Sequence, residues 1–549
     1  MSAVMQASSP TLRADAGLDR TDIWCVLGLL LLAGLYTLPF LRSPLHPYED
    51  AAMLMRYSEH LAQGHGIVWN VGEKPVDGAT DFLVMVLVAG LVKAGVGVER
   101  ATRFLGYLSH LITVLIVYWG LRRLQAAGRA LSLISAVYLA LGPAALYIAA
   151  GFETPFFALV VCAAWCFAIR IQKGDDALRW SVLLAWSALI MGLARPEGVF
   201  LAALMALALL YARGIQGSSR ALLHLSVAYG SIGVLYFLWH WHHFGYPLPN
   251  PFYRKGAGHL YWTSLYDSIR NAGLLTFPFP LAFLLGFRSP QAAKTTIFSL
   301  IPIGGFVTLW VLLLDAQNFQ WRFQYPILVL VLLSWPAPLR GLADDLRLPR
   351  FKDLDERCRK TLLGFGLALL LIVLAFEHHQ YGAVGYDGDG RFDIAVMLSH
   401  YREKNYTLAT TDPGILPLYS AWRSIDTWGL NDEWITHHGS ITESYLDRYT
   451  PQVIMFDDRF TRWVPDREWV PGMVELLTLR EYVRKNNYCL AAAFGDSPYR
   501  VHFYYVRTDF PDAADIIARI RAMNYVWVYT GEKSVDFAAG LYPCGRRDP

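Results

Sequence analysis

Residues 23–62 read IWCVLGLLLLAGLYTLPFLRSPLHPYEDAAMLMRYSEHLA. The unbroken apolar run at 23–41 is long enough to cross the hydrocarbon layer of a membrane as a helix. It is too long for the apolar core of a cleaved signal peptide, and no small-residue cleavage pattern follows it. We therefore interpret it as a first membrane span, preceded by a polar cytoplasmic segment at 1–22.

Similar apolar runs recur along the chain as far as residue 376 and then stop. Hydrophobic residues make up 54% of the 549 residues and charged residues 17%, with a mean hydropathy of +0.31. A soluble protein of this length carries about a quarter charged residues. The sequence therefore predicts a polytopic α-helical membrane domain at 23–377 and a folded non-membrane domain at 378–549. The net charge of +3 gives no reason to expect nucleic acid as a partner.

Eleven spans are expected, at 23–41, 102–122, 130–150, 153–171, 179–194, 196–212, 221–243, 264–286, 294–314, 322–338 and 361–377. Lys and Arg gather in the loop at 340–360 and in every second short loop before it, and such loops face the cytoplasm. This places the N-terminus in the cytoplasm, and the loop at 42–101 and the C-terminal domain on the outer face. The apolar stretch at 81–96 is short for a span, so we expect a re-entrant or interfacial helix there.

The first exterior loop contains a predicted amphipathic helix at 49–62. On a helical projection, its apolar residues gather on one face, and Glu49, Arg56 and His60 lie on the opposite face, with Asp50 to the side. Such a helix is typical of the outer membrane surface. A carboxylate of the Glu49–Asp50 pair could take a proton from an acceptor hydroxyl, and Arg56 could help to hold a departing phosphate. The alternative is an acidic helix start stabilised by the helix dipole, with Arg56 extended toward water.

Further charged residues stand at the outer ends of apolar helices. They are Glu153 in GFETPFF, Arg195 and Glu197 in GLARPEG, Arg254 and Lys255 in YPLPNPFYRK, and Arg322 in QWRFQYP. Each alone is explained as an interfacial anchor, but charge at membrane depth is costly and marks substrate pathways. Together the cations Arg195, Arg254, Lys255 and Arg322 predict a site for an anionic lipid headgroup.

The C-terminal domain alternates strand-like pieces (406–410, 453–456, 501–506 and 525–529) with helix-like pieces (391–404 and 511–523), which predicts an α/β domain. Asp412 and Asp426 are candidates, with His60 and Glu153, for binding the sugar or the acceptor. A turn-capping role is the alternative for both aspartates. Cys489 and Cys544 lie on the exterior side, where a disulfide is permitted, and free buried thiols are the alternative.

Histidine is a common metal ligand, and the chain has three histidine pairs, at 242–243, 378–379 and 437–438. Adjacent residues point apart on a helix or strand, and the chain has no CxxC or HExxH pattern. We expect no required metal, while a divalent cation on exterior carboxylates stays open.

The ordered motifs EDAAMLMRYSEHLAQGHGIVWNVGE, DGATDFL, GFETPFF, ARPEG, PLPNPFYRK, RFQYP and TTDPGILPLYSAWRSIDTWGLND resemble one family. It comprises the bacterial membrane glycosyltransferases of the GT-C fold related to mycobacterial terminal β-arabinofuranosyltransferases. The resemblance covers about residues 20–460.

The resemblance implies an inverting transfer of one sugar from a polyprenyl-phosphate donor, without a nucleotide. The acceptor would be an envelope glycan or glycolipid at the outer face of the bacterial inner membrane. Glu49 stands where that family has the first of two aspartates, its presumed catalytic base, and Asp50 is the acidic neighbour. The exchange of Asp for Glu leaves open which of the two carboxylates acts.

Other classes of protein remain as alternatives. A transporter or flippase for lipid-linked glycans should show internal repeats and a midplane site, and the sequence shows neither. An enzyme like the O-antigen ligases moves a whole glycan. Only the motifs above distinguish it from a glycosyltransferase that moves a single lipid-linked sugar. A catalytically inactive envelope subunit is the third alternative.

Overall fold

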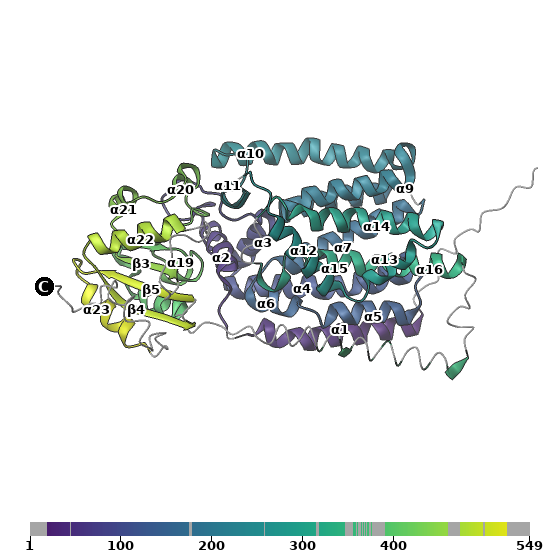
Figure 1. Ribbon diagram of the computed structural model, residues 1–549, viewed down its shortest axis with the longest axis horizontal. Coiled ribbons are helices and arrows are strands. Elements are labelled where there is room, and N and C mark those ends of the chain that lie inside the picture. The colour runs from purple at the N-terminus through teal and green to yellow at the C-terminus, as the bar shows by residue number, and fades with distance from the viewer. Residues whose placement is uncertain are drawn as a thin grey trace, which may run out of the picture.

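The computed structural model describes residues 19–43, 45–174, 178–256, 258–313, 318–345, scattered positions between 355 and 375, 390–458, 473–497 and 500–523. Figure 1 shows long helices lying side by side in a bundle, with the α/β domain at one end of it. We call the end next to the α/β domain the domain end and the opposite one the far end.

The bundle is built from the first two thirds of the chain. Its helices are α1 (Arg20–Leu41), α2 (Glu49–Ala62), α3 (Phe82–Lys93), α4 (Val98–Trp119), η1 (Gly120–Leu124), α5 (Arg129–Ala140), α6 (Ala144–Ala150), α7 (Thr154–Gln172), α8 (Leu178–Ala194), α9 (Glu197–Ala228), η2 (Tyr229–Gly233), α10 (Val234–Phe244), α11 (Asn250–Gly256), α12 (Trp262–Thr276), α13 (Pro280–Gly286), α14 (Pro290–Leu309), η3 (Phe319–Trp321), α15 (Tyr325–Ser334) and α16 (Pro336–Asp345).

Seven helical segments among the described residues are long and apolar enough to cross a membrane, or eight if the bent pair α12–α13 is one span. Each of the ten expected spans within the described residues coincides with a helical segment, and the eleventh, 361–377, lies outside them apart from isolated positions. The number of spans is lower than the eleven expected, partly because Glu197–Phe244 counts as one helical segment although two spans are expected in it. Gly214 interrupts it with a φ of 67°, which glycine adopts readily, and Figure 1 shows the two halves folded back on each other.

The expected span at 264–286 is bent. α12 and α13 meet at an angle of 97°, because Pro278 and Pro280 interrupt the helical hydrogen bonding between them. By contrast, α3 is a short helix of 12 residues, in line with the expectation that 81–96 does not cross the membrane.

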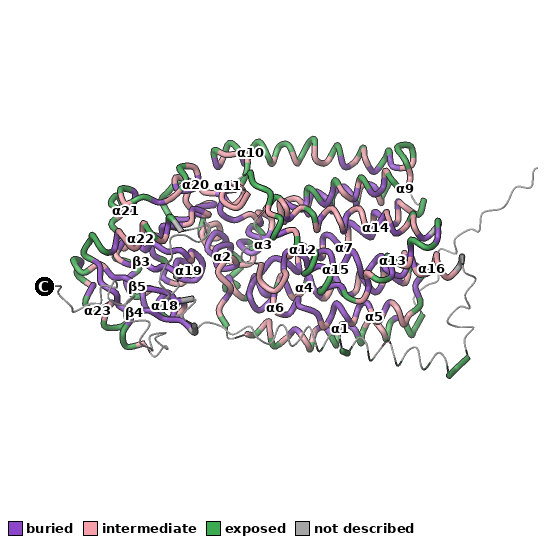
Figure 2. The backbone as a smooth tube through the Cα atoms, in the orientation of Figure 1, coloured by how far each residue is buried: buried purple, intermediate pink, exposed green. Residues whose placement is uncertain are grey.

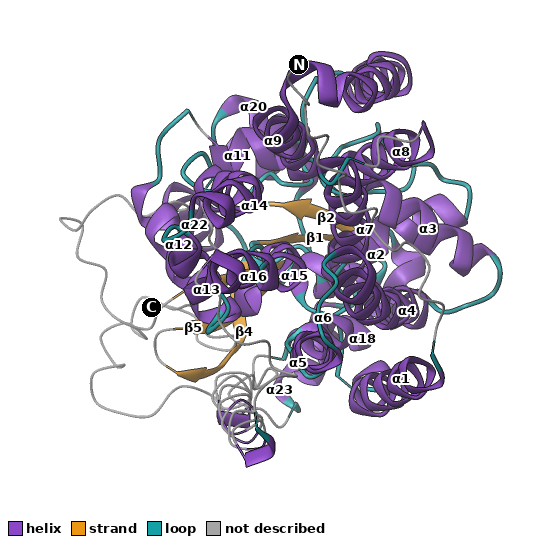
Figure 3. Ribbon diagram, turned by 90° about the vertical axis from the view of Figure 1, so that its right-hand side faces the viewer, coloured by secondary structure: helices purple, strands orange, loops and turns teal. Residues whose placement is uncertain are grey.

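The centre of the bundle is densely packed. Every residue of α15 is buried, and Figure 3 shows this helix near the centre of the bundle. By contrast, α1 and α10 lie at the periphery and have many exposed apolar residues (Figure 2). An outward-facing apolar surface of this kind is what a lipid environment requires.

Basic residues gather at the far end. Arg122 and Arg129 both pair with Asp22, at Nε–Oδ1 distances of 3.0 and 3.2 Å. Lys173 donates to a carbonyl at the end of η1, and Arg213 donates to one at the end of α7 at 3.0 Å. Cations are favourable at helix C-termini, where backbone carbonyls lack helical partners.

The α/β domain contains a five-stranded mixed sheet with the strand order β2-β1-β3-β5-β4. β1 is parallel to β2 and β3, and β5 is antiparallel to β3 and β4. The strands are β1 (Thr407–Thr410), β2 (Arg423–Asp426), β3 (Val453–Asp458), β4 (Tyr488–Ser497) and β5 (Arg500–Arg507). The helices are α18 (Arg391–Leu398), η5 (Ser399–Lys404), α19 (Ile415–Ser420), α20 (Glu433–His438), α21 (Glu443–Tyr449), α22 (Met473–Lys485) and α23 (Ala513–Arg521).

The predicted α/β class of this domain is confirmed, as is the polytopic helical class of the rest. Sequence reasoning missed β2 and β4, and the expected strand at 525–529 lies outside the described residues. Cys489 is disulfide-bonded, while Cys544, its expected partner, also lies outside them.

Candidate active site

The predicted helix at 49–62 forms with those bounds, as α2. Its two acidic residues stand in the first turn, where the helix dipole favours negative charge. The backbone N–H of Tyr48, the residue before the helix, donates to the Ala150 carbonyl at 2.9 Å and so ties the start of α2 to α6. Residues 51–58 are all buried, since α2 lies between the bundle and the α/β domain instead of at an open membrane surface.

Glu49 and Asp50 point to different places. Successive residues on a helix are separated by about 100°. The Asp50 carboxylate pairs with the Arg322 guanidinium and lines a cavity at the domain end of the bundle. The Glu49 carboxylate instead pairs with Arg391 in the α/β domain, at 2.7 Å. The structure thus brings Asp50, and not Glu49, to the cavity.

This cavity, of about 110 Å³, is lined by several charged residues as well as apolar ones. We call it the central cavity. Its charged lining residues are the acids Asp50, Asp81, Glu153 and Glu197 and the cations Arg195, Lys255 and Arg322. Of the predicted site residues, it therefore brings together Asp50, Glu153, Arg195, Lys255 and Arg322.

One half of the central cavity is acidic. Arg195 pairs with Glu153, with Glu197 at 3.1 Å and with Asp81 at 3.9 Å, so three carboxylates surround one guanidinium. Burial raises the pKa of the Asp81 carboxyl, and the neighbouring Glu153 adds to this effect.

The other half is cationic. The Arg322 guanidinium lies over the rings of Phe152 and Phe323, at 4.0 and 4.8 Å from their centroids, and its Nε has no hydrogen-bond partner among the described residues. Within the described part of the chain, the Lys255 ammonium makes no hydrogen bond or ion pair. Burial lowers the pKa of Lys255 while Asp50 partly opposes the shift. A buried donor without a partner, such as the Arg322 Nε, is costly, and an anion in this half would accept from it and from the Lys255 ammonium.

Two largely apolar grooves adjoin the central cavity. The α3–α10 groove, of about 500 Å³, shares Ala79, Thr80 and Phe252 with it. The α11–α14 groove, of about 420 Å³, shares Glu197, Phe252 and Leu313. A ligand with a charged head and a long apolar chain fits such a combination.

Arg56 does not take part in the cavity. Its guanidinium donates to the carbonyls of Trp69 and Trp422, both at 2.9 Å, and of Pro417, and to the Asn70 side chain at 3.3 Å. Burial lowers the pKa of Arg56 to about 10. The expectation that this residue faces a lipid headgroup is therefore replaced by a role in joining α2 to the α/β domain.

His60 and Arg254 also have other partners. His60 Nδ1 lies 2.9 Å from the Val68 carbonyl, and burial lowers its pKa to about 4. Arg254 pairs with Glu475 at 2.7 Å and donates to the Gly439 carbonyl at 2.5 Å. Arg254 thus connects α11 to the α/β domain, while its neighbour Lys255 lines the cavity.

The two aspartates of the α/β domain lie away from the central cavity. Asp412 accepts from Arg391 at 3.0 Å and lies 2.9 Å from His502 Nε2. Asp426 is fully buried and accepts from three backbone N–H groups and the Asn431 amide, as in the turn-capping alternative. Burial raises the pKa of Asp426 to about 6.

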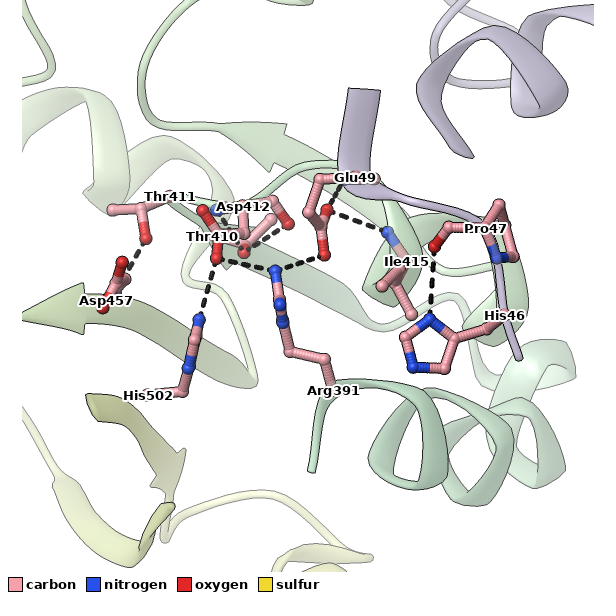
Figure 4. Close-up of polar contacts among 11 residues, drawn as sticks. His46, Pro47, Glu49, Arg391, Thr410, Thr411, Asp412, Ile415, Asp457 and His502 are labelled. Atoms are coloured by element: carbon pink, nitrogen blue, oxygen red, sulfur yellow. Dashed lines mark hydrogen bonds and ion pairs between the residues drawn. The ribbon is translucent and has the colours of Figure 1, made fainter. Parts of the chain in front are cut away.

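A possible metal site is present near Asp412. Ligand atoms of Asp412, Asp457 and His502 lie within 4.8 Å of one another. The Arg391 guanidinium already occupies the neighbourhood of Asp412 (Figure 4), so a cation there would meet a like charge. This cluster fits a metal less well than its residue types suggest.

Sequence reasoning missed Asp81 as a site residue and left Glu197 without a role. Asp81 stands directly before the apolar stretch that forms α3, and Glu197 begins α9 after Arg195. An acid at the start of an apolar helix was the available signal for both.

Comparisons with known proteins agree with this architecture. Two crystal structures of ArnT from Cupriavidus metallidurans superpose on 88% of this chain and 97% of theirs. The apo state gives a TM-score of 0.55 at 14% identity, and the state bound to undecaprenyl phosphate gives 0.53 at 13%. The chain has the GT-C fold. The Archaeoglobus fulgidus oligosaccharyltransferase, in complex with Zn and sulfate, matches at a TM-score of 0.48 and 12% identity, over 88% of this chain and 74% of its own.

Sequence comparison is less informative than structure here. Residues 376–508 match a family described as a domain of unknown function (DUF8728). No curated protein sequence matches the chain. The predicted GT-C fold is thus confirmed by structure, while the finer resemblance to arabinofuranosyltransferases stays a prediction.

Proposed function

We propose that this chain is an inverting glycosyltransferase that moves one sugar from a polyprenyl-phosphate donor to an envelope glycan or glycolipid at the outer face of the membrane. One observation carries the proposal. The Asp50 carboxylate and the Lys255 ammonium, which has no partner among the described residues, line the same cavity, which apolar grooves adjoin. The shared fold of ArnT bound to undecaprenyl phosphate supports a lipid-linked donor.

The proposed reaction needs a base and a stabilised leaving group. An acceptor hydroxyl attacks the anomeric carbon from the face opposite the phosphate, and the bond from that carbon to the phosphate oxygen breaks. Asp50 takes the hydroxyl proton, and the polyprenyl phosphate leaves with the bonding electron pair. The configuration at the anomeric carbon is therefore inverted.

The cationic half of the central cavity is the proposed phosphate site. Lys255 and the Nε of Arg322 supply donors that lack partners among the described residues, and neither needs to break a bond before it binds an anion. Donors fixed where charge develops contribute the most to transfer of this kind. Arg322 would also orient the Asp50 carboxylate, with which it pairs.

The acidic half is the proposed place of the sugar and acceptor hydroxyls. Glu153, Glu197 and Asp81 offer carboxyl oxygens that accept hydrogen bonds, and Arg195 keeps these groups in place. We assign no substrate contact to Arg56, His60, Arg254, Asp412 or Asp426, because each points to partners outside the cavity.

The orientation in the membrane follows from charge. The far end carries the basic residues of the short loops, which favours a cytoplasmic position. The α/β domain and the central cavity would then face the exterior. This is the side on which an envelope acceptor is found.

The experiment that tests this function compares a strain lacking the gene with its parent. Mass spectrometry would measure envelope glycans and polyprenyl-phosphate sugars in both. We expect the loss of one glycan residue together with accumulation of its carrier-linked form. Unchanged glycans and carrier sugars would contradict the proposal, and accumulation of a whole lipid-linked glycan would favour a ligase or flippase instead.

A further inference from the structure

The Glu49 carboxylate is held entirely by the α/β domain. Its Oε1 accepts from Arg391 at 2.7 Å, and its Oε2 accepts from the backbone N–H groups of Gly414 and Ile415 at 2.6 and 3.0 Å. Figure 4 shows the carboxylate between Arg391 and Ile415. Three donors fix both oxygens, so Glu49 has little freedom to move.

The group that holds Glu49 is itself fixed. The Arg391 side chain is 3% exposed and also donates to Asp412, which in turn lies 2.9 Å from His502 on β5. Arg391 begins α18, and Asp412 follows β1. The position of Glu49 is therefore set by the core of the α/β domain.

Gly414 allows a very close approach. A Cβ atom at this position would lie 2.7 Å from the Glu49 carbonyl carbon and would overlap its carbonyl oxygen and carboxylate. Any side chain at 414 would thus push the first turn of α2 away, without removing a polar group.

Other contacts lie on the same face of α2. The Asn431 amide lies 3.0 Å from the Met53 sulfur, and Arg56 donates to two carbonyls of the α/β domain. Glu49, Met53 and Arg56 are spaced i, i+4 and i+7, which places them on one side of a helix. Asp50 is the next residue after Glu49 and lines the central cavity, as does Leu430 of the α/β domain.

We infer that Glu49 and Arg391 are positioning residues, through which the α/β domain sets the place of Asp50 in the central cavity. This inference rests on the proposed function. The α/β domain would then be part of the catalytic unit. The proposed base Asp50 pairs with Arg322 of the bundle, while the neighbouring Glu49 is held by Arg391 of the α/β domain. Displacement of a reacting group by about 1 Å costs up to about 100-fold in rate.

The test compares Gly414→Ala, Arg391→Gln, Glu49→Gln and Asp50→Asn. The purified variants would be assayed with the carrier-linked sugar that accumulates in the strain lacking the gene, and undecaprenyl phosphate would serve as the binding probe. Gly97→Ala and Arg402→Gln are matched controls, since a Cβ at Gly97 meets nothing within 4 Å and the Arg402 side chain is 66% exposed.

We expect Gly414→Ala and Arg391→Gln to lower kcat by about 10- to 100-fold with an unchanged donor KM and unchanged undecaprenyl phosphate affinity. Glu49→Gln keeps one acceptor oxygen and should lose less. If these variants transfer at the wild-type kcat while Asp50→Asn is inactive, the positioning role is wrong and the proposed function stands. A joint loss of kcat, lipid binding and melting temperature would assign the contacts to folding alone and overturn the inference. Full activity of Asp50→Asn would instead remove the proposed base.

Discussion

Glu49 and Asp50 are adjacent and chemically alike, yet their surroundings give them separate tasks. Glu49 is held by donors of the α/β domain, whereas Asp50 meets Arg322 in the cavity that Lys255 also lines. The longer side chain of Glu49 reaches the backbone N–H groups of residues 414 and 415. The directions of the two side chains thus support Asp50 as the proposed base, although the two residues have the same chemistry.

The first residue-scale prediction concerns Lys255. Lys255→Ala should weaken undecaprenyl phosphate binding by about 10- to 100-fold, because a charge-assisted hydrogen bond contributes about 1.5–3 kcal/mol. Titration of the purified protein with this lipid measures the effect. Lys404→Ala, at a largely exposed position of the α/β domain, is the control. Equal affinities for the wild type and Lys255→Ala would remove this residue from the phosphate site.

A second residue-scale prediction concerns pH. Burial lowers the pKa of His60 to about 4, from 6.5 in an exposed histidine. Between these values the unfolded chain binds a proton that the native side chain refuses, so stability falls as the pH drops from 6.5 toward 4. Thermal unfolding at about pH 7 and pH 5 should show a smaller loss for His60→Gln than for the wild type. An equal loss in both proteins would show that His60 takes up a proton as readily in the native state as in the unfolded chain.

At the scale of elements, the sequence predicts the bounds of a helix better than it predicts the residues that the helix contacts. The bounds of α2 were predicted because its acidic start, apolar period and glycine stop lie within the same stretch. The partners of Arg56 are a different case, since Pro417 and Trp422 lie more than 350 residues further along the chain. A helical projection shows which face of a helix is polar but not which residues cover that face. For this reason, sequence predicts a phosphate contact for Arg56 and not its contacts with the α/β domain.

The grooves give the element-scale prediction. Leu248 lines both the α3–α10 and the α11–α14 groove and lies outside the long helices. Leu248→Asp would place a charge beside the carrier's apolar chain, which is unfavourable. We expect a raised KM for donors with long prenyl chains and a nearly unchanged KM for donors with one or two prenyl units. A KM independent of chain length would show that the prenyl chain lies elsewhere.

At the scale of the whole molecule, the α/β domain and the bundle form one unit around α2. The Asn70 side chain, in the loop after α2, pairs with both the N–H and the carbonyl of Ser424 on the edge strand β2, at 2.9 and 3.0 Å. Sequence patterns predict a helical bundle and an α/β domain, but they do not predict the interface between the two. Long-range packing alone determines it.

Orientation is the prediction that belongs to this scale. Cysteine introduced by Arg402→Cys, in the α/β domain, should react with a membrane-impermeant maleimide in intact cells. Cysteine introduced by Ile215→Cys, where the side chain is 76% exposed at the far end, should react only after permeabilisation. The unsubstituted chain is the control for its native cysteines. The reverse pattern would place the central cavity on the cytoplasmic side.

The central claim is that Asp50 is the base of a sugar transfer from a polyprenyl-phosphate carrier. Its most direct test is the rate of transfer by purified Asp50→Asn in a single turnover, with the carrier-linked sugar prebound. The account predicts a rate lower by about 100-fold or more, because the acceptor proton has no base to receive it, while the donor remains bound. A wild-type rate from this variant would contradict the account.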